Sequence, residues 1–512
     1  MDNISTTKRI AKNTLMLYLR QILIMLVSLY SVRVVLNVLG AEDYGVYNVV
    51  AGVVTMFGFV STTMANASQR FFSFELGQNN FEKLKRTFRV TVSIYLFIIL
   101  LVLLLAETVG LWFVKNKLVI SNNRLNAARF VYQTSIISFV ITLVTAPYMA
   151  SIIAHENMNV YAYISIVEAV LKLVIVFLLQ IIKFDKLIVY GILLLSVNFI
   201  NTGLYRFYCK KHYKECVFKP LWDKNLFFEI FGYTGWSIFG AFTTVARTQA
   251  LTVLINQFFN PVVVAARTIS GNVTYTVKTF SNNFNTSLYA PIVKEYASGN
   301  KKGAFDLVYD GCKITFFLMW IFTLPLVLRM EYVLTLWLKN LPEFVVIFTQ
   351  LSLIEVLINS VSLPIMTLAR AHGKVKLYEL VLGILQLFIF ITSWIAVGVF
   401  HCDAIVIFYI SIIFIAIMLV ARLFIVKILV DFSIKVFFIR VFLPILLVSI
   451  ISIIPSYFLN NVLPQNFISL CIIVFISLFL SSISMFYIGL GKDMRIKIST
   501  KIKSKFGRVK NV

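Results

Sequence analysis

The sequence predicts an all-α polytopic membrane protein with about 14 transmembrane helices. The chain of 512 residues is 60% hydrophobic and 13% charged, whereas a soluble domain is about 45–50% apolar and about 25% charged. Apolar runs of roughly 20 residues, the length of a helix that crosses a bilayer, recur along the chain. The alternating pattern of an outer-membrane barrel does not occur.

The predicted helices follow one another with short loops between them. They fall at 13–39, 44–68, 88–113, 128–153, 160–182, 187–208, 227–258, 262–290, 306–330, 344–368, 377–398, 404–427, 438–458 and 467–488. The first apolar run is too long for a signal peptide and lacks a small-residue cleavage site. We therefore expect it to remain as a membrane span.

The net charge of +25 comes from basic residues scattered between the apolar runs. This distribution is typical of positively charged cytoplasmic loops and not of a nucleic-acid-binding face. It predicts that both termini lie in the cytoplasm. The five cysteines and four histidines form no CxxC pair or ligand-spaced cluster, so we expect no metal site and no disulfide framework.

One stretch, AARTISGNVTYTVKTFSNNFNTSLY at 265–289, is long enough to cross a bilayer and unusually polar. If it were a loop, every later helix would reverse direction and the basic tail would lie outside. The charge rule therefore favours a membrane helix. A polar helix must face protein or water, since lipid cannot satisfy its side chains.

The chain also resembles itself after a shift of 220 residues, so that helix 44–68 overlays helix 262–290. Such a repeat predicts two six-helix lobes related by a pseudo-twofold axis. The expected organisation is listed from the N-terminus to the C-terminus: an N-lobe at 1–208, an inter-lobe loop at 209–226, a C-lobe at 227–427, two extra helices at 428–490 and a basic cytoplasmic tail at 491–512.

Ionisable residues inside apolar spans cost about 2.5–3.5 kcal/mol each on insertion scales, so each indicates a function or a partner. Arg267 and Lys278 are 11 residues apart and share one face of their helix. Arg247 lies in the middle of the preceding span, and Arg20 lies on the first. The four cations are candidate ligands for an anionic cargo. Polar residues on helices 44–68 and 262–290 are candidates for hydrogen bonds to it: Asn48, Asn66, Asn272 and Asn282.

Three further residues leave alternatives open. Glu168 and Lys172 have the i, i+4 spacing of a helical ion pair, which neutralises itself or forms a site that couples transport to an ion. Glu355 is a coupling carboxylate or a buried partner of an arginine. We find no nucleophile–base set, no glycine-rich phosphate loop and no ATP site. The sequence therefore predicts no enzyme and no cofactor beyond coupling to H⁺ or Na⁺.

The first 80 or so residues resemble the polysaccharide (O-antigen type) flippases of the multidrug/oligosaccharidyl-lipid/polysaccharide exporter superfamily. The similarity is carried by the turn LGAEDYGVY at 39–47 and by the RFFSFELG exit of the second helix at 70–77. Relatives that move a lipid-linked peptidoglycan precursor place arginines on the helices that carry Arg20 and Arg267 here.

This resemblance implies two six-helix lobes around a central cavity in the bacterial cytoplasmic (inner) membrane. It also implies alternating access and transfer of an undecaprenyl-pyrophosphate-linked oligosaccharide to the outer leaflet, for lipopolysaccharide or other surface polysaccharide. It leaves open whether the protein works alone or beside a polysaccharide polymerase and glycosyltransferases. Two alternatives are a cation-coupled multidrug or small-solute antiporter of the same superfamily and, more distantly, a membrane-embedded glycosyltransferase or polymerase.

Overall fold

The computed structural model describes residues 3–55, 57–116, 122–182, 184–338, 340–489, 491 and 495. Within these ranges every regular element is a helix. The first half comprises α1 (Asn3–Thr55), α2 (Gly58–Gly77), α3 (Phe81–Leu105), η1 (Ala106–Gly110), α4 (Leu111–Asn116), η2 (Asn122–Arg124), α5 (Leu125–Ala154), α6 (Met158–Ile181), α7 (Lys186–His212) and α8 (Lys224–Phe258). The second half comprises α9 (Pro261–Ala297), α10 (Lys301–Leu328), α11 (Met330–Leu338), α12 (Val345–His372), α13 (Lys376–Gly398), α14 (Ile405–Val430), α15 (Ile434–Phe437), η3 (Phe438–Phe442), α16 (Leu443–Val462), α17 (Phe467–Ser484) and η4 (Met485–Gly489).

These helices confirm the predicted all-α polytopic fold. Among the described residues, 12 helices are long and apolar enough to cross a membrane. The predicted spans 44–68 and 262–290 are also helical but are not among these 12. The second of them, α9, runs without a break through the polar stretch 265–289. That stretch is therefore helical and not a loop.

The predicted turn between the first two spans lies at Gly40. Its φ of 79° interrupts α1, so that two helical segments meet at a kink. Glycine adopts this left-handed conformation at little cost, because it has no Cβ atom. The second segment ends at Thr55 and α2 begins at Gly58, so the predicted single helix 44–68 consists of two pieces.

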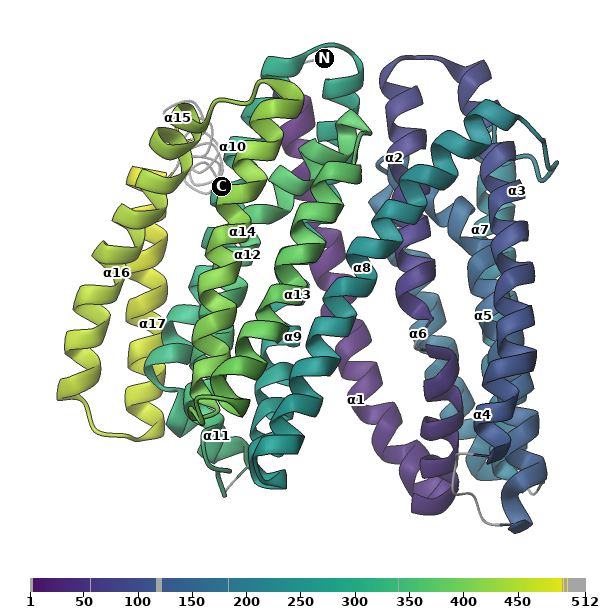
Figure 1. Ribbon diagram of the computed structural model, residues 1–512, viewed down its shortest axis with the longest axis horizontal. Coiled ribbons are helices and arrows are strands. Elements are labelled where there is room, and N and C mark those ends of the chain that lie inside the picture. Colours follow the sequence, from purple (N-terminus) through teal and green to yellow (C-terminus); the bar gives the residue numbers. More distant parts are fainter. Residues whose placement is uncertain are drawn as a thin grey trace, which may run out of the picture. The chain divides into compact units, whose positions relative to one another are not determined.

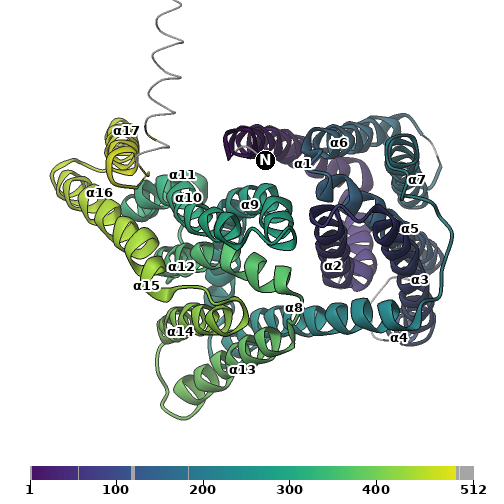
Figure 2. The same cartoon turned by 90° about the horizontal axis from the view of Figure 1, so that it is seen from above.

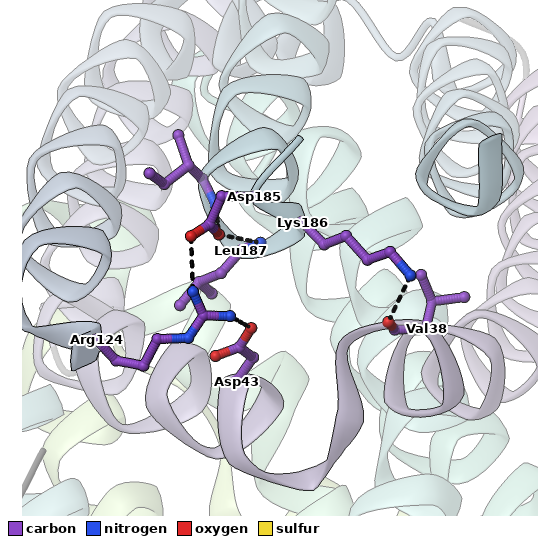
Figure 3. A network of polar contacts seen from close by, with 7 residues as sticks. Val38, Asp43, Arg124, Asp185, Lys186 and Leu187 are labelled. Atoms are coloured by element: carbon purple, nitrogen blue, oxygen red, sulfur yellow. Dashed lines mark hydrogen bonds and ion pairs between the residues drawn. The ribbon is translucent and has the colours of Figure 1, made fainter. Parts of the chain in front are cut away.

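An ion network holds this turn in place (Figure 3). Arg124 forms ion pairs with both Asp43, just after the kink, and Asp185. The Asp185 carboxylate also accepts hydrogen bonds from the first backbone N–H groups of α7, which caps that helix. Lys186 donates to the backbone oxygen of Val38. The network thereby joins the α1 kink to the starts of α5 and α7.

The chain divides into two compact units. Unit 1 contains the described residues up to Phe242 together with Tyr289–Lys301 and Gly373–Glu379, and unit 2 contains the other described residues. In unit 1, α5 packs among α2, α3 and α7 (Figure 2). Its core contains large buried aromatic side chains: Phe72, Phe88, Tyr132 and Tyr148.

In unit 2, α12 lies beside α14, and α16 lies beside α17 (Figure 1). Helices α8, α9 and α13 each contribute residues to both units. The predicted lobe boundaries at 208 and 227 stay predictions. The predicted basic tail at 491–512 lies outside the described residues, except for Gly491 and Arg495.

Candidate functional site

Unit 2 brings together residues that are far apart in the sequence. Arg247 of α8 and Glu355 of α12 form an ion pair with 3.1 Å between Nη2 and Oε1. Their side chains are 13% and 21% exposed. The Nε and Nη1 atoms of Arg247 are buried and have no hydrogen-bond partner among the described residues. Glu355 is therefore an arginine partner in this structure, and Arg247 retains unused hydrogen-bond donors.

The other two predicted cations of unit 2 lie on α9. Arg267 donates from Nε to the Thr252 hydroxyl at 3.1 Å, and its guanidinium lies 5.7 Å from the centre of the Phe408 ring. Lys278 interacts electrostatically with Glu355, but the structure gives its ammonium group no hydrogen bond to a described residue. Both side chains are partly buried.

A fourth cation, Arg422, escaped the sequence prediction. It lies on α14, is 8% exposed and donates to the Asn359 side chain at 3.4 Å. Like Arg247, it acts electrostatically on Lys278. The available signal in the sequence was an arginine within the strongly apolar predicted helix 404–427. We call Arg247, Arg267, Lys278, Arg422 and Glu355 the unit 2 charge cluster.

The predicted asparagines of α9 do not join this cluster by any contact in the structure. Asn272 and Asn282 have exposed side chains. The neighbouring hydroxyl groups point inward instead: Ser270 donates or accepts a hydrogen bond with Ser352 of α12, and Ser281 is buried. The polar stripe of α9 therefore has a protein-facing side and an exposed side.

Unit 1 contains a separate cavity of about 420 Å³, bounded by α1, α6 and α7. Four predicted site residues line it: Arg20, Asn48, Glu168 and Lys172. The Lys172 ammonium lies 2.6 Å from the Glu168 carboxylate, which confirms the ion pair predicted from their spacing. We call this space the unit 1 cavity.

Some polar groups at the unit 1 cavity form hydrogen bonds with neighbouring side chains. Asn201 donates to the second oxygen of Glu168 at 2.9 Å. Arg20 donates to the Ser165 hydroxyl at 3.4 Å and lies 4.7 Å from the centre of the Tyr161 ring. Asn66 of α2 has an exposed side chain and does not line the cavity. The structure thus brings four of the predicted residues together and leaves Asn66 apart.

Comparison with known proteins identifies the fold. The MatE family model matches residues 17–178. No curated protein matches the chain. A multidrug resistance MATE family transporter of the MOP superfamily, solved in an outward-facing conformation, is 10% identical with a TM-score of 0.71, over 83% of this chain and 95% of that one.

Two further solved structures agree with this result. MATE in its bent conformation is 9% identical with a TM-score of 0.69, over 83% of this chain and 95% of that one. The Vibrio cholerae MATE transporter VcmN, solved as a mutant, is 13% identical with a TM-score of 0.62, over 85% of this chain and 99% of that one.

The chain therefore has the MATE transporter fold. Together with the 12 long apolar helices, this result confirms the predicted all-α, multi-pass membrane architecture. The more specific resemblance to polysaccharide flippases stays a prediction. One of the three solved structures is described as a multidrug resistance transporter and none of the three as a polysaccharide flippase, so these comparisons fit the antiporter alternative better than the flippase.

Proposed function

We propose that this protein is an alternating-access transporter whose cargo is an anionic lipid, an oligosaccharide linked to undecaprenyl pyrophosphate. One observation carries the choice of cargo. The unit 2 charge cluster holds four cations, Arg247, Arg267, Lys278 and Arg422, against the single carboxylate of Glu355. Such an excess of buried positive charge is costly unless an anion compensates it.

The cations also have the chemistry that a pyrophosphate needs. A guanidinium group matches phosphate oxygens with two parallel donors, and an ammonium group adds a mobile point charge. Arg247 has two buried nitrogens without a partner among the described residues. Lys278 has no hydrogen bond to a described residue. These two residues are therefore our first candidates for phosphate ligands.

The proposal includes the cellular setting. The cargo would reach the outer leaflet of the bacterial inner membrane and enter lipopolysaccharide or another surface polysaccharide. Glycosyltransferases would supply it, and a polymerase would extend it. Both termini would lie in the cytoplasm, where the basic loops face the anionic leaflet.

The second candidate function is cation-coupled multidrug antiport. It is supported by the solved structures, one of which is described as a multidrug resistance transporter. The charge cluster argues against cationic drugs, because a cationic cargo would require an excess of carboxylates. An anionic or neutral drug would remain compatible with it.

The two functions differ in a reconstituted system. The purified chain is placed in liposomes, and two cargos are followed: a fluorescent undecaprenyl-pyrophosphate saccharide and the cationic dye ethidium. We expect transfer of the lipid-linked saccharide and no movement of the dye. Lys278→Glu should reduce transfer of the lipid-linked saccharide about 100-fold, since it replaces an attraction to the pyrophosphate by a repulsion.

The control is Lys211→Glu, because it reverses the charge of an exposed lysine in the last turn of α7, outside the cavity lining and the charge cluster. It should affect transfer less than Lys278→Glu. Ethidium transport without transfer of the lipid-linked saccharide would establish the antiporter instead.

A further inference from the structure

The unit 1 cavity has a lining unlike that of the unit 2 charge cluster. Its carboxylate is already held by Lys172 and Asn201, so it offers no free negative charge to a cationic ligand. Arg20 is the other charged residue of the lining. The volume of about 420 Å³ falls within the range of roughly 300–1,000 Å³ that ligand pockets occupy.

Four tyrosines line this cavity, and they come from three helices. Tyr44 and Tyr47 belong to α1, Tyr161 to α6 and Tyr190 to α7. The rings of Tyr47 and Tyr190 meet edge to face, with 4.8 Å between their centres. A tyrosine offers an apolar ring face together with a hydroxyl that both donates and accepts hydrogen bonds.

Small polar side chains also form part of the cavity lining. Ser28, Ser31 and Asn48 line the same cavity. The Ser31 hydroxyl is buried and has no hydrogen-bond partner among the described residues. The Asn48 amide nitrogen donates to the backbone oxygen of Tyr44, which leaves its side-chain oxygen as an acceptor. The lining thus combines flat apolar surfaces with unused neutral hydrogen-bonding groups.

We propose that the unit 1 cavity binds one or two sugar rings of the cargo, either uncharged or carrying a single carboxylate that faces Arg20. A pyranose ring has an apolar C–H face for the tyrosines and a rim of hydroxyl groups for Ser31 and Asn48. This inference rests on the proposed function, because it assigns the saccharide portion of that cargo to unit 1. It predicts that binding of the sugar is separable from binding of the pyrophosphate.

The test uses lipid-free sugars and the full chain in lipid nanodiscs. The probes are the methyl glycosides of a hexose, an N-acetylhexosamine and a hexuronic acid, observed by saturation-transfer NMR. We expect at least one to bind. Tyr47→Leu and Tyr190→Leu should each weaken binding about tenfold, and Asn48→Leu about fivefold. Tyr47→Phe keeps the ring and loses the hydroxyl, so it should weaken binding less than Tyr47→Leu.

Two matched controls lie outside the cavity lining. Tyr163→Leu changes a tyrosine of α6 that is 60% exposed, and Asn66→Leu changes an exposed asparagine. Both variants should bind the sugar probes as tightly as the unsubstituted protein does. The inference is overturned if no probe binds, or if the two Tyr→Leu variants fold and bind normally. It is also overturned if the control variants lose binding equally.

The two proposals fail in different ways. If lipid-linked saccharide is transferred but no free sugar binds, the sugar site is wrong and the proposed function stands. If sugars bind in the cavity and Lys278→Glu leaves transfer of the lipid unchanged, the sugar site stands and the assignment of the phosphate site is wrong.

Discussion

The two units differ in how their partly or fully buried charges are balanced. In unit 1, Glu168 is neutralised by Lys172, and Glu156 is neutralised by two cations. In unit 2, the charge cluster has one carboxylate for four cations. Neutralised charges stabilise a fold, whereas an uncompensated excess of one sign attracts a ligand of the other sign. The comparison therefore supports the proposed cargo binding at the ions of unit 2. It leaves stabilisation of the fold, and at the Glu168–Lys172 pair coupling to a proton gradient, as the expected roles of the ions of unit 1.

We expect the largest effect, a loss of stability, from substitution of Glu156, which lies in the turn between α5 and α6. Its side chain is 2% exposed and lies 2.7 Å from Arg9 and 2.8 Å from Lys294. Burial lowers the pKa of Lys294, and the Glu156 carboxylate opposes that effect. Glu156→Ala would leave the cations uncompensated. Because the side chains of Arg9 and Lys294 are 43% and 24% exposed, water can solvate them in part. We therefore expect a loss of about 3 kcal/mol, the lower end of the range for breaking a buried ion pair, and thermal unfolding in detergent measures it.

The matched control for this prediction is an exposed ion pair. Arg440 and Asp306 lie 2.6 Å apart with side chains 45% and 42% exposed. Arg440→Ala should reduce stability by about 1 kcal/mol or less. Equal melting temperatures for the Glu156→Ala and Arg440→Ala variants would contradict a structural role for the buried charges of unit 1.

The contrast between the two units was only partly predictable from the sequence. Local patterns sufficed for the helices, the turn at Gly40 and the Glu168–Lys172 pair, because each depends on neighbouring residues along one chain segment. The Arg247–Glu355 pair joins α8 to α12 across 108 positions. Helical periodicity shows which face of a helix is polar but not which helix that face meets.

The same limit applies to the unit 1 cavity and to the Glu156 cluster. The four tyrosines of the cavity lie on three helices, and in the sequence they are ordinary aromatic residues of apolar spans. Glu156 was hidden in a short polar turn, where a carboxylate is normally solvated. Its burial results from packing against the ends of α1 and α9, which bring Arg9 and Lys294 to it.

The second prediction separates binding from structure within unit 2. Arg247→Ala should reduce transfer of the lipid-linked saccharide about 100-fold, because it removes a phosphate ligand and leaves Glu355 unpaired. The double variant Arg247→Ala/Glu355→Ala removes both charges of the pair. If Arg247 binds cargo, the double variant should transport as poorly as the single one. Recovery of transport in the double variant would show that the pair is structural.

The smallest expected effect concerns the ion that drives transport. It tests which unit couples transport to a proton or sodium gradient. Both candidate carboxylates already hold a side-chain cation: Glu168 lies 2.6 Å from Lys172, and Glu355 lies 3.1 Å from Arg247. A sodium ion would have to displace that cation, whereas a proton ends the ion pair simply by neutralising the carboxylate. We therefore expect a proton gradient to change the transfer rate about tenfold, the effect of about 1.4 kcal/mol. A sodium gradient should leave the rate unchanged.

Glutamine variants locate the coupling, since glutamine keeps the shape of the side chain and cannot take up a proton. Glu168→Gln should abolish the response to the proton gradient and retain a basal rate, because the unit 1 pair can open without exposing the unit 2 cations. Glu355→Gln should keep the response and lower the rate at every pH, because Arg247 loses its partner. If instead Glu355→Gln abolishes the response and Glu168→Gln keeps it, the charge cluster couples transport to protons. A response to a sodium gradient would contradict the prediction that Lys172 and Arg247 keep sodium from these carboxylates.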